Sequence, residues 1–159
     1  MQIRLISVGR VREPFYREGV QEYLKRLKPY APVELVEGLD EKLGPRAGAR
    51  EVEGVLNREG QRVLGLLRED ELLVALDAGG KAMDSEAFAR WMEGLLLSGK
   101  TRLSFLVGSA AGISEAVKRR ADHTVSLSAM TLPHQMAALL LAEQIYRAFK
   151  IMRGEPYHK

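Results

Sequence analysis

Three segments of this sequence place glycine or small polar residues directly after an apolar run, a composition typical of ligand-binding loops. They are residues 76–81 (LDAGGK), 107–113 (VGSAAGI) and 127–134 (LSAMTLPH). Glycine lets a ligand approach the backbone closely, and small side chains leave room for a flat group the size of adenine. If the apolar runs are parallel strands, the three segments lie at one edge of the sheet, where ligands bind in such folds. The sequence therefore predicts a ligand crevice built from all three.

The motifs of several other chemistries are absent. Neither the dinucleotide fingerprint G-x-G-x-x-G nor the phosphate loop G-x-x-x-x-G-K-[ST] occurs, which disfavours an NAD enzyme or a nucleotide hydrolase. Ser109 lies in Gly-Ser-Ala rather than in the G-x-S-x-G turn of a serine hydrolase. There is no cysteine and no H-E-x-x-H, and His123, His134 and His158 are scattered. We therefore expect neither thiol chemistry nor a metal site.

Alternating strands and helices are needed to position these segments. Short apolar runs predict strands over residues 3–8, 33–36, 72–76, 103–107 and 124–127. Longer periodic stretches predict helices over about 14–27, 47–67, 85–97, 114–120 and 133–152, with Asp84 and Ser114 as N-caps. Such alternation is typical of a parallel sheet with helices on both faces. The 159 residues contain no repeat or linker, so we predict one α/β domain over residues 1–159.

The charge is slightly positive and unevenly distributed. Lys and Arg number 24 against 21 Asp and Glu, a formal net charge of +3. Residues 118–159 contain seven basic and three acidic side chains, which indicates a polyanion as partner, although a solvated helix face explains the same charges. No apolar run approaches the ~18–20 residues of a membrane span, and we expect a cytoplasmic protein with no membrane partner.

The last predicted helix is apolar around most of its circumference between residues 136 and 149. Such a helix must be covered on more than one side. In a small protein a second subunit would supply that cover, which predicts a homodimer. A central position in the core of a monomer would also explain it.

Five motifs, in order along the chain, resemble one family of enzymes. They are residues 76–81 (LDAGGK), 103–108 (LSFLVG), 126–135 (SLSAMTLPHQ), 143–148 (EQIYRA) and 156–159 (PYHK). The family is that of the ribosomal RNA large subunit methyltransferase H enzymes, within the SPOUT class that uses S-adenosylmethionine (SAM). The likeness spans essentially the whole chain.

The resemblance implies a SPOUT fold with a deep trefoil knot in its C-terminal chain, and a homodimer. It also implies methylation of N3 of a pseudouridine in a stem-loop of 23S rRNA, on the assembled 70S ribosome. The residues that would bind SAM are Leu76, Gly108, Leu127, Ser128, Ala129, Met130, Thr131 and Leu132. Two positions depart from the family pattern: Ser109 stands where a second glycine is usual, and Ala138 stands where arginine is frequent.

Methyl transfer to N3 requires that the imide proton leave, so that the nitrogen becomes a good nucleophile. SAM brings an activated methyl group but no base, so a side chain of the protein would have to help remove that proton. His158, beside Tyr157 where the family motif ends, is the candidate base; the alternative is that the pair only packs the tail or stacks on RNA. Phosphate contacts should come from basic side chains near the C-terminus. The candidates are Arg119, Arg120, Arg147, Lys150, Arg153 and Lys159.

Two other functions remain open from the sequence. One is a non-catalytic protein that binds RNA or the ribosome, and the other is a SPOUT methyltransferase that acts on tRNA. The intact segment 127–132 argues for cofactor binding and against the first. The absence of an appended RNA-binding domain argues against the second, because it favours a large preassembled substrate.

Overall fold

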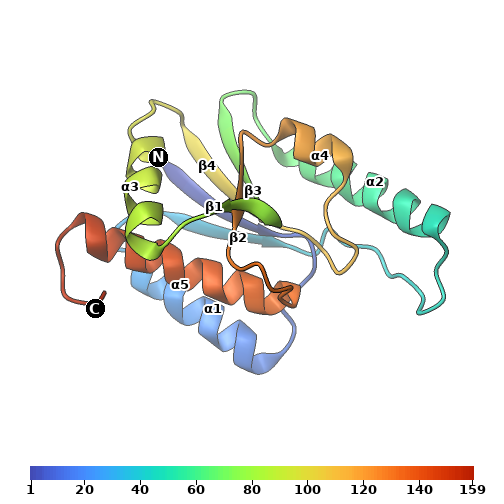
Figure 1. The fold of residues 1–159 in the computed structure, drawn as a ribbon, viewed down its shortest axis with the longest axis horizontal. Coiled ribbons are helices and arrows are strands. Elements are labelled where there is room, and N and C mark those ends of the chain that lie inside the picture. The colour runs from blue at the N-terminus through green and yellow to red at the C-terminus, as the bar shows by residue number, and fades with distance from the viewer.

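The computed structural model describes residues 1–159, in which five strands alternate with five helices (Figure 1). The elements are β1 (Gln2–Ser7), α1 (Pro14–Leu27), β2 (Val33–Glu37), α2 (Ala49–Leu66), β3 (Glu71–Ala82), α3 (Ser85–Leu96), β4 (Arg102–Val107), α4 (Glu115–Arg120), β5 (His123–Ser126) and α5 (His134–Met152). Every predicted element is present, and only β3 differs substantially in length. No helix has the length and apolar character needed to cross a membrane.

All five strands run parallel in one sheet, in the order β2-β1-β4-β3-β5. The predicted parallel sheet is therefore confirmed. β4 lies at its centre, and Leu103, Phe105 and Leu106 are fully buried there. A strand covered on both faces has to be apolar on both, which explains the nearly continuous apolar run.

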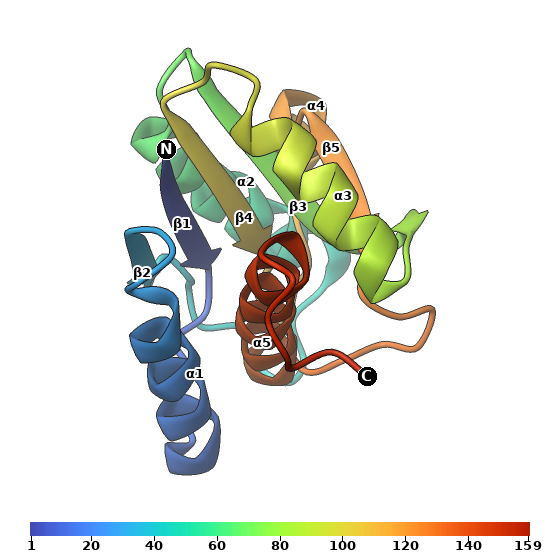
Figure 2. The same cartoon turned by 90° about the vertical axis from the view of Figure 1, so that its left-hand side faces the viewer.

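Helices cover both faces of the sheet. On one face α5 lies between α1 and α3, and on the other lie α2 and α4 (Figure 2). The larger core forms under α5, where Ile145 packs with Leu5 and Phe105 of the sheet. The smaller core forms under α2 and α4, around Leu73 and Leu106.

The apolar circumference of α5 is covered mostly by its own chain. Ala138, Leu141, Ala142 and Ile145 are completely buried without a second subunit. The central helix of a monomer core thus accounts for most of the apolar pattern, so the pattern alone does not require a homodimer. The homodimer itself stays a prediction.

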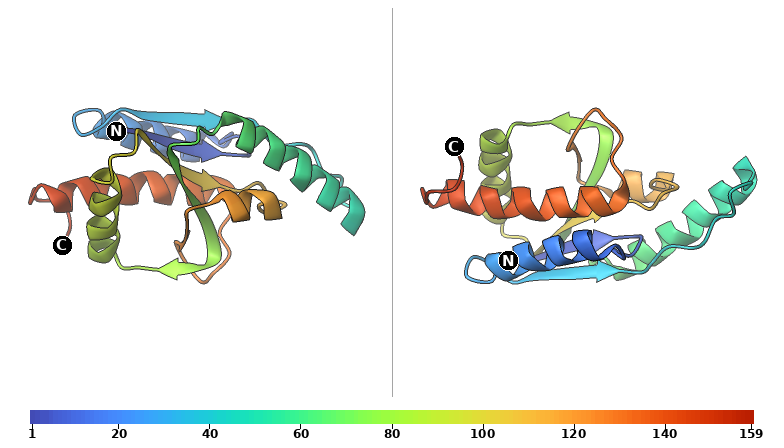
Figure 3. Two further views of the ribbon diagram at one scale, coloured as in Figure 1. Left: turned by 90° about the horizontal axis from the view of Figure 1, so that it is seen from above. Right: turned by 90° about the horizontal axis from the view of Figure 1, so that it is seen from below.

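The glycine segment after Leu76, which we expected as a loop, belongs to strand β3. Val125 of β5 pairs with Leu76 and again with Lys81, so residues 77–80 form an arch between two stretches of the same ladder. Figure 3 shows the light-green end of β3 turned away from the rest of the strand, with the orange chain beside it. We refer to residues 77–80 as the β3 arch. The trefoil knot implied by the resemblance stays a prediction.

Gly80 of the β3 arch touches the backbone of β5 directly. A Cβ atom there would lie 2.8 Å from the carbonyl carbons of Thr124 and Val125 and from the nitrogen of Val125. Backbone atoms in a paired strand have no free direction in which to move. Glycine is therefore required at this position by a neighbouring strand rather than by a ligand.

We expect Gly80→Ala to lower the free energy of unfolding by at least the ~1–3 kcal/mol typical of an overpacked interior. Gly79→Ala is the matched control, because its Cβ would meet only Asp77 Oδ2 at 3.9 Å. Urea denaturation of both variants measures the difference. Equal stability of the two would contradict the close packing of the arch against β5.

Candidate functional site

A cleft of about 790 Å³ opens at the carboxyl edge of the sheet. Residues 76–78 of β3 and the chain that follows β4 and β5 line it, so parts of all three predicted segments meet in one place. Pockets of roughly 300–1,000 Å³ hold small molecules and cofactors. The lining residues are 76–78, 107–113, 118, 127, 128, 130–134 and 137.

Seven of the eight residues that the resemblance assigns to SAM line this cleft. Ala129 does not, although both of its neighbours do. Ser126 Oγ donates to the carbonyl of Ser128 (3.0 Å), and the Met130 N–H donates to Ser128 Oγ (3.0 Å). These two hydrogen bonds fold the chain sharply after β5, so that its successive residues face different directions.

The loop after β4, which we refer to as the Gly108 loop (residues 108–113), turns back on itself. The Gly112 N–H donates to the Ser109 carbonyl (2.9 Å), and Gly112 has a φ of +101°, which favours glycine. A Cβ at Gly108 would lie 2.7 Å from the Gly112 carbonyl oxygen. The closure of the loop by itself therefore requires glycine at position 108, and the close approach of a ligand there stays a prediction.

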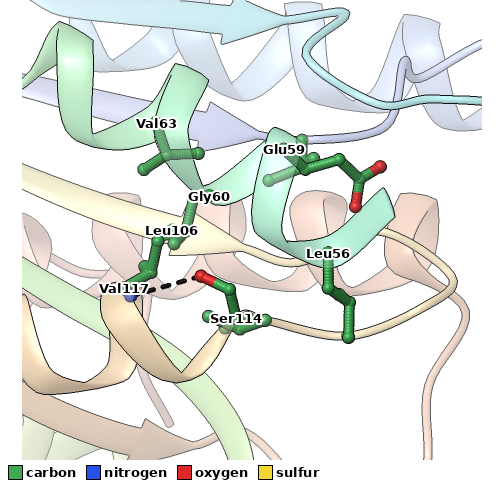
Figure 4. A pocket seen from close by; sticks show the side chains of 10 residues that line it. Leu56, Glu59, Gly60, Val63, Leu106, Ser114 and Val117 are labelled. Carbon is green, nitrogen blue, oxygen red and sulfur yellow. Dashed lines mark hydrogen bonds between the residues drawn. The ribbon is translucent and has the colours of Figure 1, made fainter. Parts of the chain in front are cut away.

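Helix α2 supports both ends of the Gly108 loop, and Figure 4 shows the end at Ser114. At one end Ser109 Oγ donates to Glu59 Oε1 (2.7 Å). At the other end a Cβ at Gly60 would collide with Ser114 Oγ. Ser114 is the predicted N-cap of α4 and accepts from the Val117 N–H (3.3 Å). The hollow left between α2 and α4 measures about 10 Å³, no more than a single water would need.

Sequence reasoning missed Glu59, although a signal was present. Glu59 lies four residues after Val55 and four before Val63, and all three are buried on α2. Residues four apart share a helix face. A carboxylate in the middle of an apolar stripe is therefore visible in the sequence, and it indicates a specific partner inside the fold.

The start of α5 closes the cleft beside β1. His134 Nε2 donates to the Arg10 carbonyl (3.3 Å), and Gln135 Oε1 accepts from the N–H groups of Arg12 and Glu13 (2.8 and 2.9 Å). Gly9 allows this contact, because a Cβ there would lie 2.7 Å from His134 Nε2. These contacts hold the start of α5 against the connection between β1 and α1.

Tyr157 and His158 lie at the other end of α5. The Tyr157 hydroxyl donates to Glu143 Oε1 (2.9 Å), and Arg147 Nη1 donates to His158 Nδ1 (3.1 Å). Arg147 follows the cleft residue Ala137 by ten positions, which is about 15 Å of helix at 1.5 Å per residue. Within one chain the structure does not bring the C-terminal pair to the cleft.

The six basic residues expected to contact phosphate fall into two groups. Three are engaged by their own chain: Arg120 donates to Asp122 (3.1 Å), Arg147 to Glu143, and Lys150 to Glu155 (2.7 Å). The other three, Arg119, Arg153 and Lys159, are exposed. Arg153 also lies over the Tyr30 ring, 4.7 Å from its centre.

Comparison with known proteins decides the family. The family model described as predicted SPOUT methyltransferase matches residues 1–158. The chain belongs to the SPOUT methyltransferase family. The resemblance drawn from the motifs is therefore confirmed, and membership implies that the cofactor is a methyl donor.

Full-length relatives of this SPOUT methyltransferase carry a more specific name. Proteins named ribosomal RNA large subunit methyltransferase H from Syntrophomonas wolfei, Carboxydothermus hydrogenoformans and Enterococcus faecalis are 54%, 44% and 43% identical to it. Each alignment covers 100% of both chains over 159 residues.

The surroundings of Tyr157 fix its protonation state in this SPOUT methyltransferase. Burial, followed by contacts with Tyr23 and Glu143, raises the pKa of the Tyr157 phenol well above its ordinary value. The ring also packs edge-on against Tyr146, with centroids 4.8 Å apart. At neutral pH Tyr157 is therefore a hydrogen-bond donor and not a base.

We expect Tyr157 to ionise above the ordinary tyrosine range of about 10. Because the folded pKa is the higher one, the contribution of Tyr157 to stability is complete below that range and is lost as the pH rises through the folded pKa. Ultraviolet titration of the phenolate should show a late step that Tyr157→Phe removes and Glu143→Gln moves to lower pH. A titration that neither variant alters would show that the tail does not bury Tyr157.

Proposed function

We propose that this protein transfers a methyl group from SAM to N3 of a pseudouridine in 23S rRNA, on the assembled 70S ribosome. The observation that carries the proposal is the match to SPOUT methyltransferases over residues 1–158, in a chain whose three predicted ligand segments contribute to a single cleft. The name that its full-length relatives carry supports ribosomal RNA of the large subunit as the substrate. The pseudouridine and its N3 atom are the expectation drawn from the motifs.

The cleft suits SAM in size and in chemistry. Ten of its 19 lining residues are hydrophobic, as a site for an adenine ring and an alkyl chain should be. Leu76, Leu127 and Leu132 would enclose the adenine, and neighbouring backbone groups would bind its edge. Asp77 and Lys118 supply one charge of each sign at the lining, which complements the amino and carboxylate groups of the methionine part.

SAM supplies an activated methyl group on its sulfonium. The residues of the chain have to orient that group towards the acceptor nitrogen and exclude water. His158 is the proposed base for the N3 proton. Arginine only donates hydrogen bonds, so Nδ1 of His158 accepts from Arg147, and Nδ1 has to leave this contact before it can take the N3 proton. Tyr157, which stays protonated, would bind or orient the target nucleobase.

A homodimer would bring the tail of one chain to the cleft of the other. Within one chain, about 15 Å of helix separates Ala137 in the cleft from Arg147 beside the tail, so a tail that acts at a cleft would have to come from a second chain. Large apolar side chains are exposed on elements that border the cleft: Phe15 is 64% exposed, Met130 79% and Leu140 39%. Apolar groups on several elements at one edge are suited to contact with a second copy of this chain.

The function is tested by calorimetry with SAM, followed by transfer of a labelled methyl group to 70S ribosomes, free 23S rRNA and tRNA. We expect SAM to bind and 70S ribosomes to be the best substrate, and Gly108→Val to abolish SAM binding because it deforms the Gly108 loop. Methylation of tRNA alone would favour the tRNA enzyme. Ribosome binding without SAM binding would favour the non-catalytic protein.

Mixed dimers test whether cleft and tail come from different chains. Wild-type protein should sediment at about 35 kDa, twice the chain mass of 17.7 kDa. His158→Ala should slow the saturated single-turnover rate by ~10²–10⁴-fold, the cost of a lost acid–base group.

Co-expressed with Gly108→Val, the His158→Ala chain should recover about a quarter of wild-type activity, since half of the dimers are mixed and each has one intact site. If the activity of the co-expressed mixture does not exceed that of the His158→Ala protein alone, each tail serves its own cleft.

A further inference from the structure

Glu59 of α2 is a buried carboxylate without a cationic partner. It is 3% exposed, and its oxygens accept from Ser109 Oγ (2.7 Å) and from the Glu41 N–H (3.0 Å). The other buried carboxylate, Glu71, is paired with Arg4 and Arg102. An ionised group inside a protein costs stability unless it is paired, so a role in stability does not account for Glu59.

One hydrogen bond connects Glu59 to the lining of the cleft. Ser109 lines the cleft, and it also organises the turn of the Gly108 loop. Its hydroxyl accepts from the Ala111 N–H (3.2 Å), and its carbonyl accepts from the Gly112 N–H (2.9 Å). The Ser109 hydroxyl donates its proton to Glu59 and accepts from the Ala111 N–H. Glu59 therefore fixes the orientation of the hydroxyl in which its oxygen can accept the loop hydrogen bond.

Glu59 itself lies on a rigid support. Val55 and Val63, one turn to either side, are buried, and Val63 packs with Leu73 and Leu106 of the sheet. Glu41, whose N–H binds Glu59, uses its own carboxylate to accept from Arg58 (3.0 Å) and Arg62 (2.9 Å) on α2. These hydrogen bonds and ion pairs, with Arg58 first, lower the pKa of Glu41. The connection before α2 is therefore fastened to the helix that carries Glu59.

We infer that Glu59 is a positioning residue for the methyl-donor cleft: through Ser109 it holds the Gly108 loop in the shape that binds SAM. The inference rests on the proposed function for the identity of the ligand. It also gives a reason for the serine at position 109, where the family more often has glycine. A loop held before the ligand arrives does not lose conformational entropy on binding, and this favours affinity.

A double-mutant cycle on SAM affinity tests the inference, with Glu59→Gln, Ser109→Ala and the double variant. Calorimetry well below the unfolding temperature should give a roughly tenfold weaker Kd for each single variant, the effect of losing a hydrogen bond to a charged group. The double variant should lose little more, because both changes remove the same interaction. The inference is overturned if the free-energy effects of the two single substitutions add in the double variant, or if the Kd is unchanged in both single variants.

Glu71→Gln is the matched control for general destabilisation. Glu71 is equally buried, at 2% exposure, but it lies at the start of β3, at the edge of the sheet away from the cleft. We expect Glu71→Gln to lower the unfolding temperature and leave the Kd for SAM unchanged. A Kd weakened as much as in Glu59→Gln would mean that any buried charge change disturbs the cleft, and would overturn the inference.

Hydrogen exchange without SAM gives a readout that does not depend on the ligand. The amides of Ala111 and Gly112 should exchange faster in Glu59→Gln and in Ser109→Ala than in the wild type, and at the wild-type rate in Glu71→Gln. Unchanged exchange in both loop variants overturns the role of Glu59. If the wild type binds no SAM, the proposed function fails, and the exchange rates still decide whether Glu59 holds the loop.

Discussion

The close contact between β5 and the β3 arch is the constraint from which the site follows. Two backbones meet at Gly80, and Val125 pairs with β3 on both sides of the arch. β5 therefore cannot slide along β3 without breaking both pairings. The chain after β5 has to emerge beside the ends of β3 and β4, where it completes the cleft, and it then returns over the sheet as α5.

The two buried carboxylates, Glu71 and Glu59, differ in their partners and in the part of the fold that they contact. Burial alone would raise the pKa of Glu71, but hydrogen bonds from Ser104, the Arg68 N–H and Arg4 hold it below its ordinary value. That network ties β1, β3 and β4 together at the edge of the sheet away from the cleft. Glu59 has no such pairing and faces the loop that lines the cleft. Proteins commonly accept a locally costly group where a function requires it.

The sequence predicted the elements and the edge of the sheet, because hydrophobic period and strand-to-helix alternation are local properties. It did not predict that β3 continues past Leu76, since the second half of β3 is held by a pairing with Val125 that lies 44 residues further along the chain. It also did not predict that Gly108 is needed for the closure of its own loop, because the contact with Gly112 depends on how the loop folds back. Glu59 was readable from its register with Val55 and Val63, whereas its partner Ser109 was not, because only the fold brings α2 to that loop.

Helix α5 separates the cleft at its first turn from the C-terminal tail at its last turns. Its first turn is fastened to the β1–α1 connection through Gln135, and its last turns hold the tail through Glu143 and Arg147. A tail held in this way cannot reach its own cleft without giving up these contacts. If two chains pair about a two-fold axis that crosses α5 at right angles, the helices run antiparallel, and each tail comes to the end of the partner's helix where the cleft lies. In such a pair, the contacts that hold the tail away from its own cleft would present it to the partner's cleft.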